Sequence, residues 1–145
     1  TAGVVYLPAR DKLYAAATGE GAAVNGVAIR TGTRTDPDGA TILAPKPSLD
    51  PRWWTHPMPR FERHWRPSLA YRFCLVAEGR FDAMLTLKDA WEWDIAAGAL
   101  IAEEAGATVT DRNGKALRLN DRNAKSAGIL TGAPELHRAI RSRLE

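Results

Sequence analysis

Asp94 is the residue whose type and setting most clearly suggest chemistry. It stands directly before segment 95–98, Ile-Ala-Ala-Gly, whose small and apolar residues predict a helix over residues 95–105 that Gly106 ends. Small side chains leave the backbone N–H groups of a helix start uncovered. These groups and the positive end of the helix dipole attract an anion such as phosphate.

Two roles for Asp94 follow from this setting. Its carboxylate could cap the free N–H groups of the helix start, as an isolated aspartate in that position usually does. Alternatively it binds a Mg²⁺ ion, because a carboxylate beside a bound phosphate would repel it unless a cation lay between them. The uncovered helix start favours a site that combines metal and phosphate.

Alternating helices and strands are predicted on both sides of Asp94. Residues 68–77 carry apolar side chains at helical spacing, with Pro67 before the start and Gly79 after the end. The other predicted elements are strands over 81–87, 108–110 and 129–131, a hairpin turn at Asn113-Gly114 and a helix over 134–144. This alternation indicates a layered α/β protein.

The amino-terminal residues instead predict antiparallel strands. Runs of β-branched or aromatic residues over 3–6 and 12–17 flank Pro8–Asp11 and form a predicted hairpin, and further strands are expected at 27–30 and 41–44. Between the last two strands, Asp36-Pro37-Asp38-Gly39 predicts a turn.

Residues 45–67 hold six prolines and three tryptophans and predict an ordered loop without helix. Its tryptophans could stack an adenine, or they could anchor the loop by packing. His56 and His64 lack the spacing of metal ligands.

Composition limits the class of protein. The chain has 145 residues, a net charge of +3 and a single cysteine, Cys74, which lies on a predicted apolar helix face. One cysteine excludes an internal disulfide and favours the cytoplasm, while scattered arginines and the absence of a long apolar run argue against nucleic-acid and membrane partners. The charge excess suits an anionic substrate but is also common without one.

Three segments together resemble the inositol monophosphatase family. Residues 93–98 (Trp-Asp-Ile-Ala-Ala-Gly) with Glu104-Ala105-Gly106 are similar to its carboxyl-terminal signature, residues 3–26 to its central hairpin, and residues 68–79 to the helix that follows. The resemblance implies the layered α-β-α-β-α sandwich of sugar phosphatases, of which this chain is the carboxyl-terminal half. The expected parts are a strand segment over 1–44 in the central sheet of the amino-terminal subdomain, a loop over 45–67 and an α/β subdomain over 68–145.

The resemblance also implies a magnesium-dependent phosphomonoesterase, in which Mg²⁺ activates a water for attack on phosphorus and stabilises the leaving oxygen. Asp94 matches a metal ligand of the family and lies near the leaving group. Ser68, Arg72 and Lys46 are further candidates for substrate binding, although Ser68 could simply cap its helix and Arg72 could simply be solvated.

Two acidic metal motifs of the family are expected before Thr1, and segment 36–41 does not replace them because it lacks a spacer residue. We therefore expect this chain alone to be inactive and the amino-terminal half of the same protein to be its partner. A homodimer is a further expectation from the resemblance.

Departures from the family pattern bear on the substrate. Leu87 stands where inositol-specific members have a glutamate, and Pro67-Ser68 replaces a Gly-Ser or Gly-Thr pair. Residues 73–79 resemble bacterial 3′(2′),5′-bisphosphate nucleotidases, which indicates the 3′-phosphate of 3′-phosphoadenosine 5′-phosphate as the group removed. Hydrolysis of inositol monophosphate or another sugar phosphate is the alternative. A non-catalytic fragment or degenerate homologue that only packs with a partner is an alternative of another class.

Overall fold

Four antiparallel strands at the start of the chain form the first sheet, in the order β1-β2-β3-β4, in a computed structural model that describes residues 1–145. The strands are β1 Ala2–Leu7, β2 Lys12–Ala17, β3 Gly21–Val24 and β4 Val27–Ile29. A 3-10 turn, η1 Pro8–Arg10, joins β1 to β2. Asn25 and Gly26 both have positive φ in the tight turn between β3 and β4. The predicted amino-terminal hairpin is confirmed.

The second sheet has five strands in the order β6-β5-β7-β11-β9. Their bounds are β5 Thr41–Leu43, β6 Glu62–His64, β7 Ala83–Thr86, β9 Thr108–Thr110 and β11 Ile129–Gly132. Strand β5 pairs in parallel with β6 and β7, whereas β11 lies antiparallel between β7 and β9. Strands β7 and β9 therefore run in the same direction.

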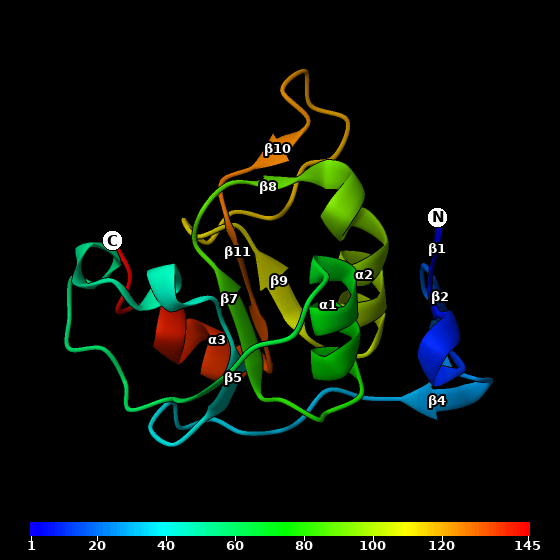
Figure 1. Cartoon of the computed structure of the whole chain (residues 1–145), viewed down its shortest axis with the longest axis horizontal. Coiled ribbons are helices and arrows are strands. Elements are labelled where there is room, and N and C mark those ends of the chain that lie inside the picture. Colours follow the sequence, from blue (N-terminus) through cyan, green and yellow to red (C-terminus); the bar gives the residue numbers. More distant parts are fainter.

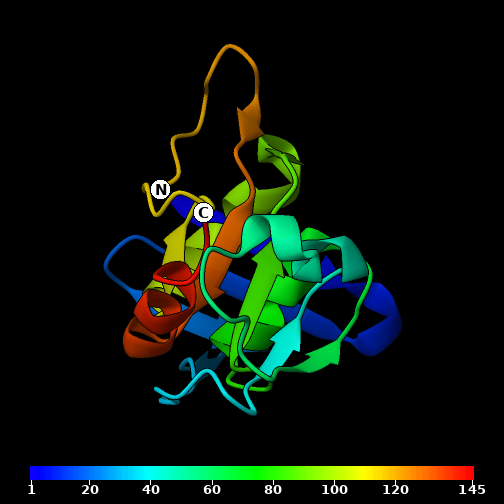
Figure 2. The ribbon, with the colours of Figure 1, turned by 90° about the vertical axis from the view of Figure 1, so that its left-hand side faces the viewer.

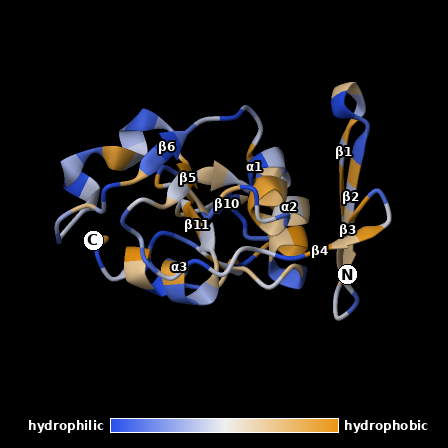
Figure 3. Ribbon diagram, turned by 90° about the horizontal axis from the view of Figure 1, so that it is seen from below, coloured by the Kyte–Doolittle hydropathy of each residue, from blue (hydrophilic) through white to orange (hydrophobic).

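Helices α1 and α2 lie between the two sheets, and α3 covers the far face of the second sheet (Figures 1 and 3). The bounds are α1 Leu69–Ala77, α2 Glu92–Glu104 and α3 Pro134–Arg141. A short pair, β8 Ala90–Trp91 and β10 Lys125–Ser126, adjoins the start of α2, and the loop between β9 and β10 extends beyond the body of the molecule (Figure 2). The predicted layered α/β class is confirmed. None of the three helices is long and apolar enough to cross a membrane.

The layers bury two clusters of apolar side chains. The larger one joins the first sheet to α1 and α2 and includes Tyr14, Phe73 and Ile95. Cys74 is buried in the same cluster, as expected for a core residue. The smaller cluster joins the second sheet to α3 and includes Ile42. Because α1 and α2 contribute to the larger cluster together with both sheets, their positions depend on packing from two sides.

Three sequence predictions about individual segments are wrong. Helix α2 begins at Glu92 and not at residue 95. Residues 45–67 contain η2 Lys46–Leu49 and η3 Pro51–Trp53, because proline is accepted in the first turn of a helix. They also contain strand β6. The turn at Asn113-Gly114 forms but joins no hairpin, since β9 pairs with β11.

The division of the chain also differs from the predicted segments. Strand β5, over Thr41–Leu43, pairs within the second sheet, although the segment 1–44 was expected to belong to one sheet. The chain passes from the first sheet to the second between residues 30 and 40. The turn predicted at residues 36–39 lies in this connection, where Asp36 accepts a hydrogen bond from the backbone N–H of Asp38.

Close contact between α1 and α2 depends on Gly98. A Cβ atom at this position would lie 2.9 Å from the Cβ and Cδ2 atoms of Phe73, which is buried on α1. Replacing Gly98 with alanine improves helix propensity by about 1 kcal/mol but overpacks a filled core, which costs about 1–3 kcal/mol.

We expect Gly98→Ala to lower the free energy of unfolding of the full-length protein by about 1 kcal/mol, because overpacking outweighs propensity. Urea unfolding monitored by circular dichroism measures this change. Gly32→Ala is the matched control, since only an Asp82 oxygen at 3.9 Å lies near its added Cβ. Equal stability of the two variants would contradict the proposed contact.

A buried histidine on α3 makes the fold sensitive to acid. The ring Nε2 of His137 lies 2.8 Å from the Thr110 hydroxyl, which itself donates to the carbonyl of Asp111 and must therefore accept from the ring. Burial, with Arg141 nearby, lowers the pKa of His137 to about 4. The unfolded chain therefore binds this proton more readily than the folded chain does.

Stability from His137 is present above the unfolded pKa of about 6.5 and is lost as the pH falls toward 4. We expect this group to lower the free energy of unfolding by about 2 kcal/mol between pH 7 and pH 5. In His137→Gln, whose amide can still donate to Thr110, that part of the pH dependence should disappear. Urea unfolding of both proteins at the two pH values tests this, and identical pH dependence would exclude His137 as its source.

Candidate active site

The amino-terminal ends of α1 and α2 meet the carboxyl ends of β5 and β7 at one edge of the second sheet (Figure 1). Helix α1 leads into β7 and α2 follows it, so both helices run opposite to that strand and begin at the same edge. The carboxyl ends of parallel strands are the usual ligand-binding edge of an open α/β sheet. We call this region the helix-start edge.

All four residues predicted to bind metal or substrate belong to the helix-start edge. Lys46 follows β5, Ser68 precedes α1, and Arg72 and Asp94 lie near the starts of α1 and α2. The fold thus brings to one edge residues as far apart in the sequence as Lys46 and Asp94.

Asp94 is the third residue of α2, within its first turn, and its side chain is exposed. It makes no hydrogen bond or ion pair with the rest of the chain. The helix cap is Trp91, which provides no side-chain hydrogen bond. The capping role considered for Asp94 is therefore wrong, because the helix starts before it. Its carboxylate remains free beside the positive end of the helix dipole.

Ser68 does cap its helix. Its hydroxyl accepts a hydrogen bond from the backbone N–H of Tyr71 at 3.3 Å, and its φ of 65° is unusual for a residue other than glycine. Lys46 is exposed in the first turn of η2 and makes neither a hydrogen bond nor an ion pair. The hydroxyl proton of Ser68 and the ammonium group of Lys46 are both available to an anion at this edge.

Arg72 is buried, with 8% of its surface exposed, which differs from the solvated arginine considered above. Its Nη1 donates to the hydroxyl of Thr86 at 3.3 Å, and the guanidinium carbon lies 5.9 Å from the centre of the Trp65 ring. Its Nε is buried without a hydrogen-bond partner. Burial lowers the pKa of Arg72 below its usual range. No carboxylate of this chain balances the charge.

Glu92 was not recognised as a structural part of this region. Its two carboxylate oxygens accept hydrogen bonds from the backbone N–H groups of Asn120 and Asp121, at 2.7 and 3.0 Å. It therefore fastens the loop between β9 and β10 to the first turn of α2. The sequence signal was the acidic residue two positions before Asp94, which lies outside the helix predicted over residues 95–105.

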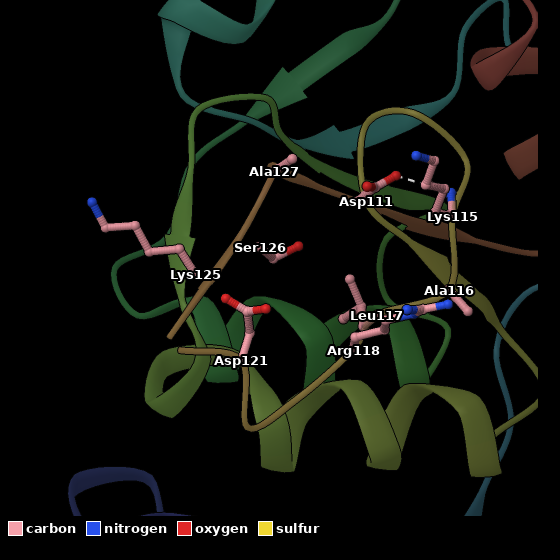
Figure 4. A pocket seen from close by; sticks show the side chains of 9 residues that line it. All are labelled: Asp111, Lys115, Ala116, Leu117, Arg118, Asp121, Lys125, Ser126 and Ala127. Atoms are coloured by element: carbon pink, nitrogen blue, oxygen red, sulfur yellow. Dashed lines mark hydrogen bonds between the residues drawn. The ribbon is translucent and has the colours of Figure 1, made fainter. Parts of the chain in front are cut away.

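The fastened loop borders a cavity of about 570 Å³ (Figure 4). Its charged lining residues are Asp111, Lys115, Arg118, Asp121 and Lys125. Asp121 and Ser126 face the opening, whereas the ammonium end of Lys125 points away from it. The five basic residues among positions 111–127, against two acidic ones, were the signal for this charged loop in the sequence.

The tryptophans at 53 and 54 anchor the proline-rich segment. The indole N–H of Trp53 donates to the carbonyl of Pro47, and that of Trp54 donates to the carbonyl of Ser48. The hydroxyl of Ser48 in turn accepts from the backbone N–H of Leu87, just beyond β7. This chain of contacts fixes η2, and with it the backbone of Lys46, against the helix-start edge.

Metal binding at this edge needs more than this chain provides. No group of three or more His, Cys, Asp or Glu side chains lies close enough together to hold a metal ion. The free carboxylate of Asp94 fits a Mg²⁺ ion in ligand type, since Mg²⁺ prefers oxygen ligands. It can supply only one side chain, so further ligands would have to come from elsewhere.

Comparison with known proteins agrees with this geometry. A model of the inositol monophosphatase family matches residues 1–145. The chain is 30% identical over 151 residues to Nus factor SuhB of Pasteurella multocida, which covers 99% of this chain and 54% of that protein. It is 33% identical over 133 residues to inositol monophosphatase 2 of Solanum lycopersicum, which covers 83% of this chain and 49% of that protein.

Solved structures give the same result. Inositol monophosphatase-II of Staphylococcus aureus aligns with a TM-score of 0.78 and 26% identity, covering 97% of this chain and 54% of that one. The chain thus spans about half the length of the relatives that it matches. Because the family model matches from the first residue to the last, the chain belongs to the inositol monophosphatase family.

Proposed function

We propose that the protein containing this chain is a magnesium-dependent phosphomonoesterase that acts at the helix-start edge, and that its substrate is 3′-phosphoadenosine 5′-phosphate. One observation carries the proposal most directly. The exposed, unpaired carboxylate of Asp94 and the buried guanidinium of Arg72, which has no counter-charge, both lie at the helix-start edge. Residues 1–145 alone should be inactive, because they offer a single metal ligand.

Asp94 is the proposed metal ligand. A bound Mg²⁺ ion would activate a water and neutralise charge on the phosphoryl group. The first turn of α2 directs backbone N–H groups toward the same space, which favours binding of the phosphate oxygens. Asp94 is exposed and makes no hydrogen bond or ion pair, so it can bind a cation without losing such a bond in the folded chain.

Arg72 favours a substrate with two phosphate groups. A buried guanidinium with an unpaired Nε is destabilising unless an anion meets it, and phosphate accepts paired N–H donors well. Ser68, the cap of α1, is one turn before Arg72. In this arrangement Asp94 binds the Mg²⁺ ion at the phosphate that is removed. Arg72, Ser68 and Lys46 bind the second phosphate.

Inositol monophosphate or another sugar phosphate is the alternative substrate. The Solanum relative is named an inositol monophosphatase, and structures of the Staphylococcus protein hold inositol monophosphate in one case and 2′-AMP in another. A non-catalytic role is the alternative of another class, and several relatives carry the name Nus factor SuhB. Phosphate release by the full-length protein with Mg²⁺ is measured with 3′-phosphoadenosine 5′-phosphate and with inositol monophosphate to separate these possibilities. If neither compound is hydrolysed, the non-catalytic role is favoured.

We expect Asp94→Asn in the full-length protein to lower kcat/KM by about 100-fold or more and to raise the Mg²⁺ concentration needed for activity, because a metal ligand loses its charge. Phosphate release over a range of Mg²⁺ concentrations measures both effects. Glu103→Gln, an equivalent change at the other end of α2, is the control and should keep normal activity. An unchanged Mg²⁺ requirement in Asp94→Asn would remove it from the metal site.

We expect Arg72→Met to raise KM for 3′-phosphoadenosine 5′-phosphate about tenfold or more but to leave KM for 3′-AMP, which lacks the second phosphate, little changed. The variant should be as stable as the natural protein or more stable by about 1 kcal/mol, since an unbalanced buried charge is removed. Steady-state kinetics and urea unfolding measure the two effects.

Arg138→Met, on the exposed side of α3, is the control for loss of a positive charge. A loss of stability in Arg72→Met without any change in the ratio of the two KM values would show that Arg72 has a structural role and does not bind phosphate.

A further inference from the structure

Two tryptophans at the start of α2 are stacked on each other at the surface. The ring centres of Trp91 and Trp93 lie 4.7 Å apart, and the ring planes differ by 11°. Trp91 is 41% exposed and Trp93 is 68% exposed. Large aromatic surface facing water is unfavourable, and where it is ordered it often marks a binding site. Trp93 directly precedes Asp94.

The Trp91 ring has two close neighbours. The ammonium group of Lys125 lies 4.3 Å from the centre of the ring, and Trp93 is stacked on the ring as well. Trp93 is stacked on Trp91 through one face of its ring and is 68% exposed, so its other face is open to solvent.

The surroundings hold the pair in place. Trp91 belongs to β8 and is the register partner of Lys125 in β10, which fixes the cation above the ring. Glu92, between the two tryptophans in sequence, binds two backbone N–H groups of the adjoining loop. A rigid aromatic face loses little entropy when a flat ligand stacks on it, so the free face of Trp93 is organised for binding before the ligand arrives.

We propose that the free face of Trp93 stacks the base of a nucleotide substrate, with Trp91 and Lys125 as its support. This inference rests on the proposed phosphatase function and adds to it the residue that recognises the base of the substrate. Asp94 is the next residue in the same helical turn, so one turn of α2 would offer contacts to both the phosphate and the base. An inositol or glycerol phosphate has no flat ring to occupy the indole face.

The test compares 3′-AMP with glycerol 2-phosphate, since both are monophosphates and only the first has a base. In the full-length protein, Trp93→Leu should lower the ratio of kcat/KM for 3′-AMP to kcat/KM for glycerol 2-phosphate about tenfold, mainly through KM for 3′-AMP. Trp93→Phe, which keeps an aromatic face, should retain most of the ratio. Trp91→Leu should cause a smaller decrease, because it removes only the support.

The outcomes separate this inference from the function on which it rests. If the natural protein releases phosphate from none of 3′-phosphoadenosine 5′-phosphate, 3′-AMP and glycerol 2-phosphate with Mg²⁺, the proposed function itself fails. If the natural protein is active but Trp93→Leu changes both substrates equally, or Trp93→Phe is as impaired as Trp93→Leu, base stacking is excluded. A fall in the ratio of the two kcat/KM values in Trp93→Leu, with most of the ratio retained in Trp93→Phe, supports the stacking role. If hydrolysis of glycerol 2-phosphate is too slow to measure, the same comparison is made with KM for 3′-AMP alone.

Discussion

The contact between Gly98 and Phe73 determines how closely the two central helices approach, and the candidate site depends on that approach. There is no room for a side chain at Gly98, so the backbone of α2 lies directly against a buried aromatic ring of α1. Glu104, at the other end of α2, accepts hydrogen bonds from the N–H groups of Gly19 and Gly21 in the first sheet. The helix is therefore held along its length, and its first turn has a defined position relative to the start of α1.

This rigid frame carries residues with features that do not favour folding. Asp94 makes no hydrogen bond or ion pair, Arg72 is buried with an unsatisfied Nε, and the backbone of Ser68 holds a positive φ. Each feature is neutral or unfavourable for folding, and their concentration at one edge is typical of a site built for a ligand. Favourable polar contacts nearby, such as those of Glu92 and Ser48, instead fix the backbone that surrounds these residues.

Sequence patterns predicted those helices and strands that are marked by apolar spacing or turn residues within the segment itself. The apolar spacing in residues 68–77 and the hairpin of residues 3–17 correspond closely to α1, β1 and β2. The start of α2 could not be placed, because Trp91-Glu92-Trp93 contains two aromatic residues that also suit a strand and no capping side chain marks the boundary. Helix boundaries without a cap have no local signal.

The details of the site depend on tertiary contacts for the same reason. Asp94 and its neighbours could be selected by residue type, but the burial of Arg72 follows from the positions of Thr86 and Trp65, on other elements. The cation beside the stacked pair of Trp91 and Trp93 likewise comes from Lys125, which follows them by more than thirty residues. No periodicity within one helix reports such contacts, so only the structure reveals them.

The outer face of the first sheet is uncovered in residues 1–145. Val4, Tyr6 and Leu13 are 57%, 55% and 43% exposed on this face, although a sheet normally buries its apolar side chains against another layer. An α-β-α-β-α sandwich has a helical layer on each outer side, and residues 1–145 supply such a layer only beyond the second sheet. The chain spans about half the length of the relatives that it matches, and we propose that the remaining part of such a protein covers this face and adds ligands to a metal ion bound by Asp94.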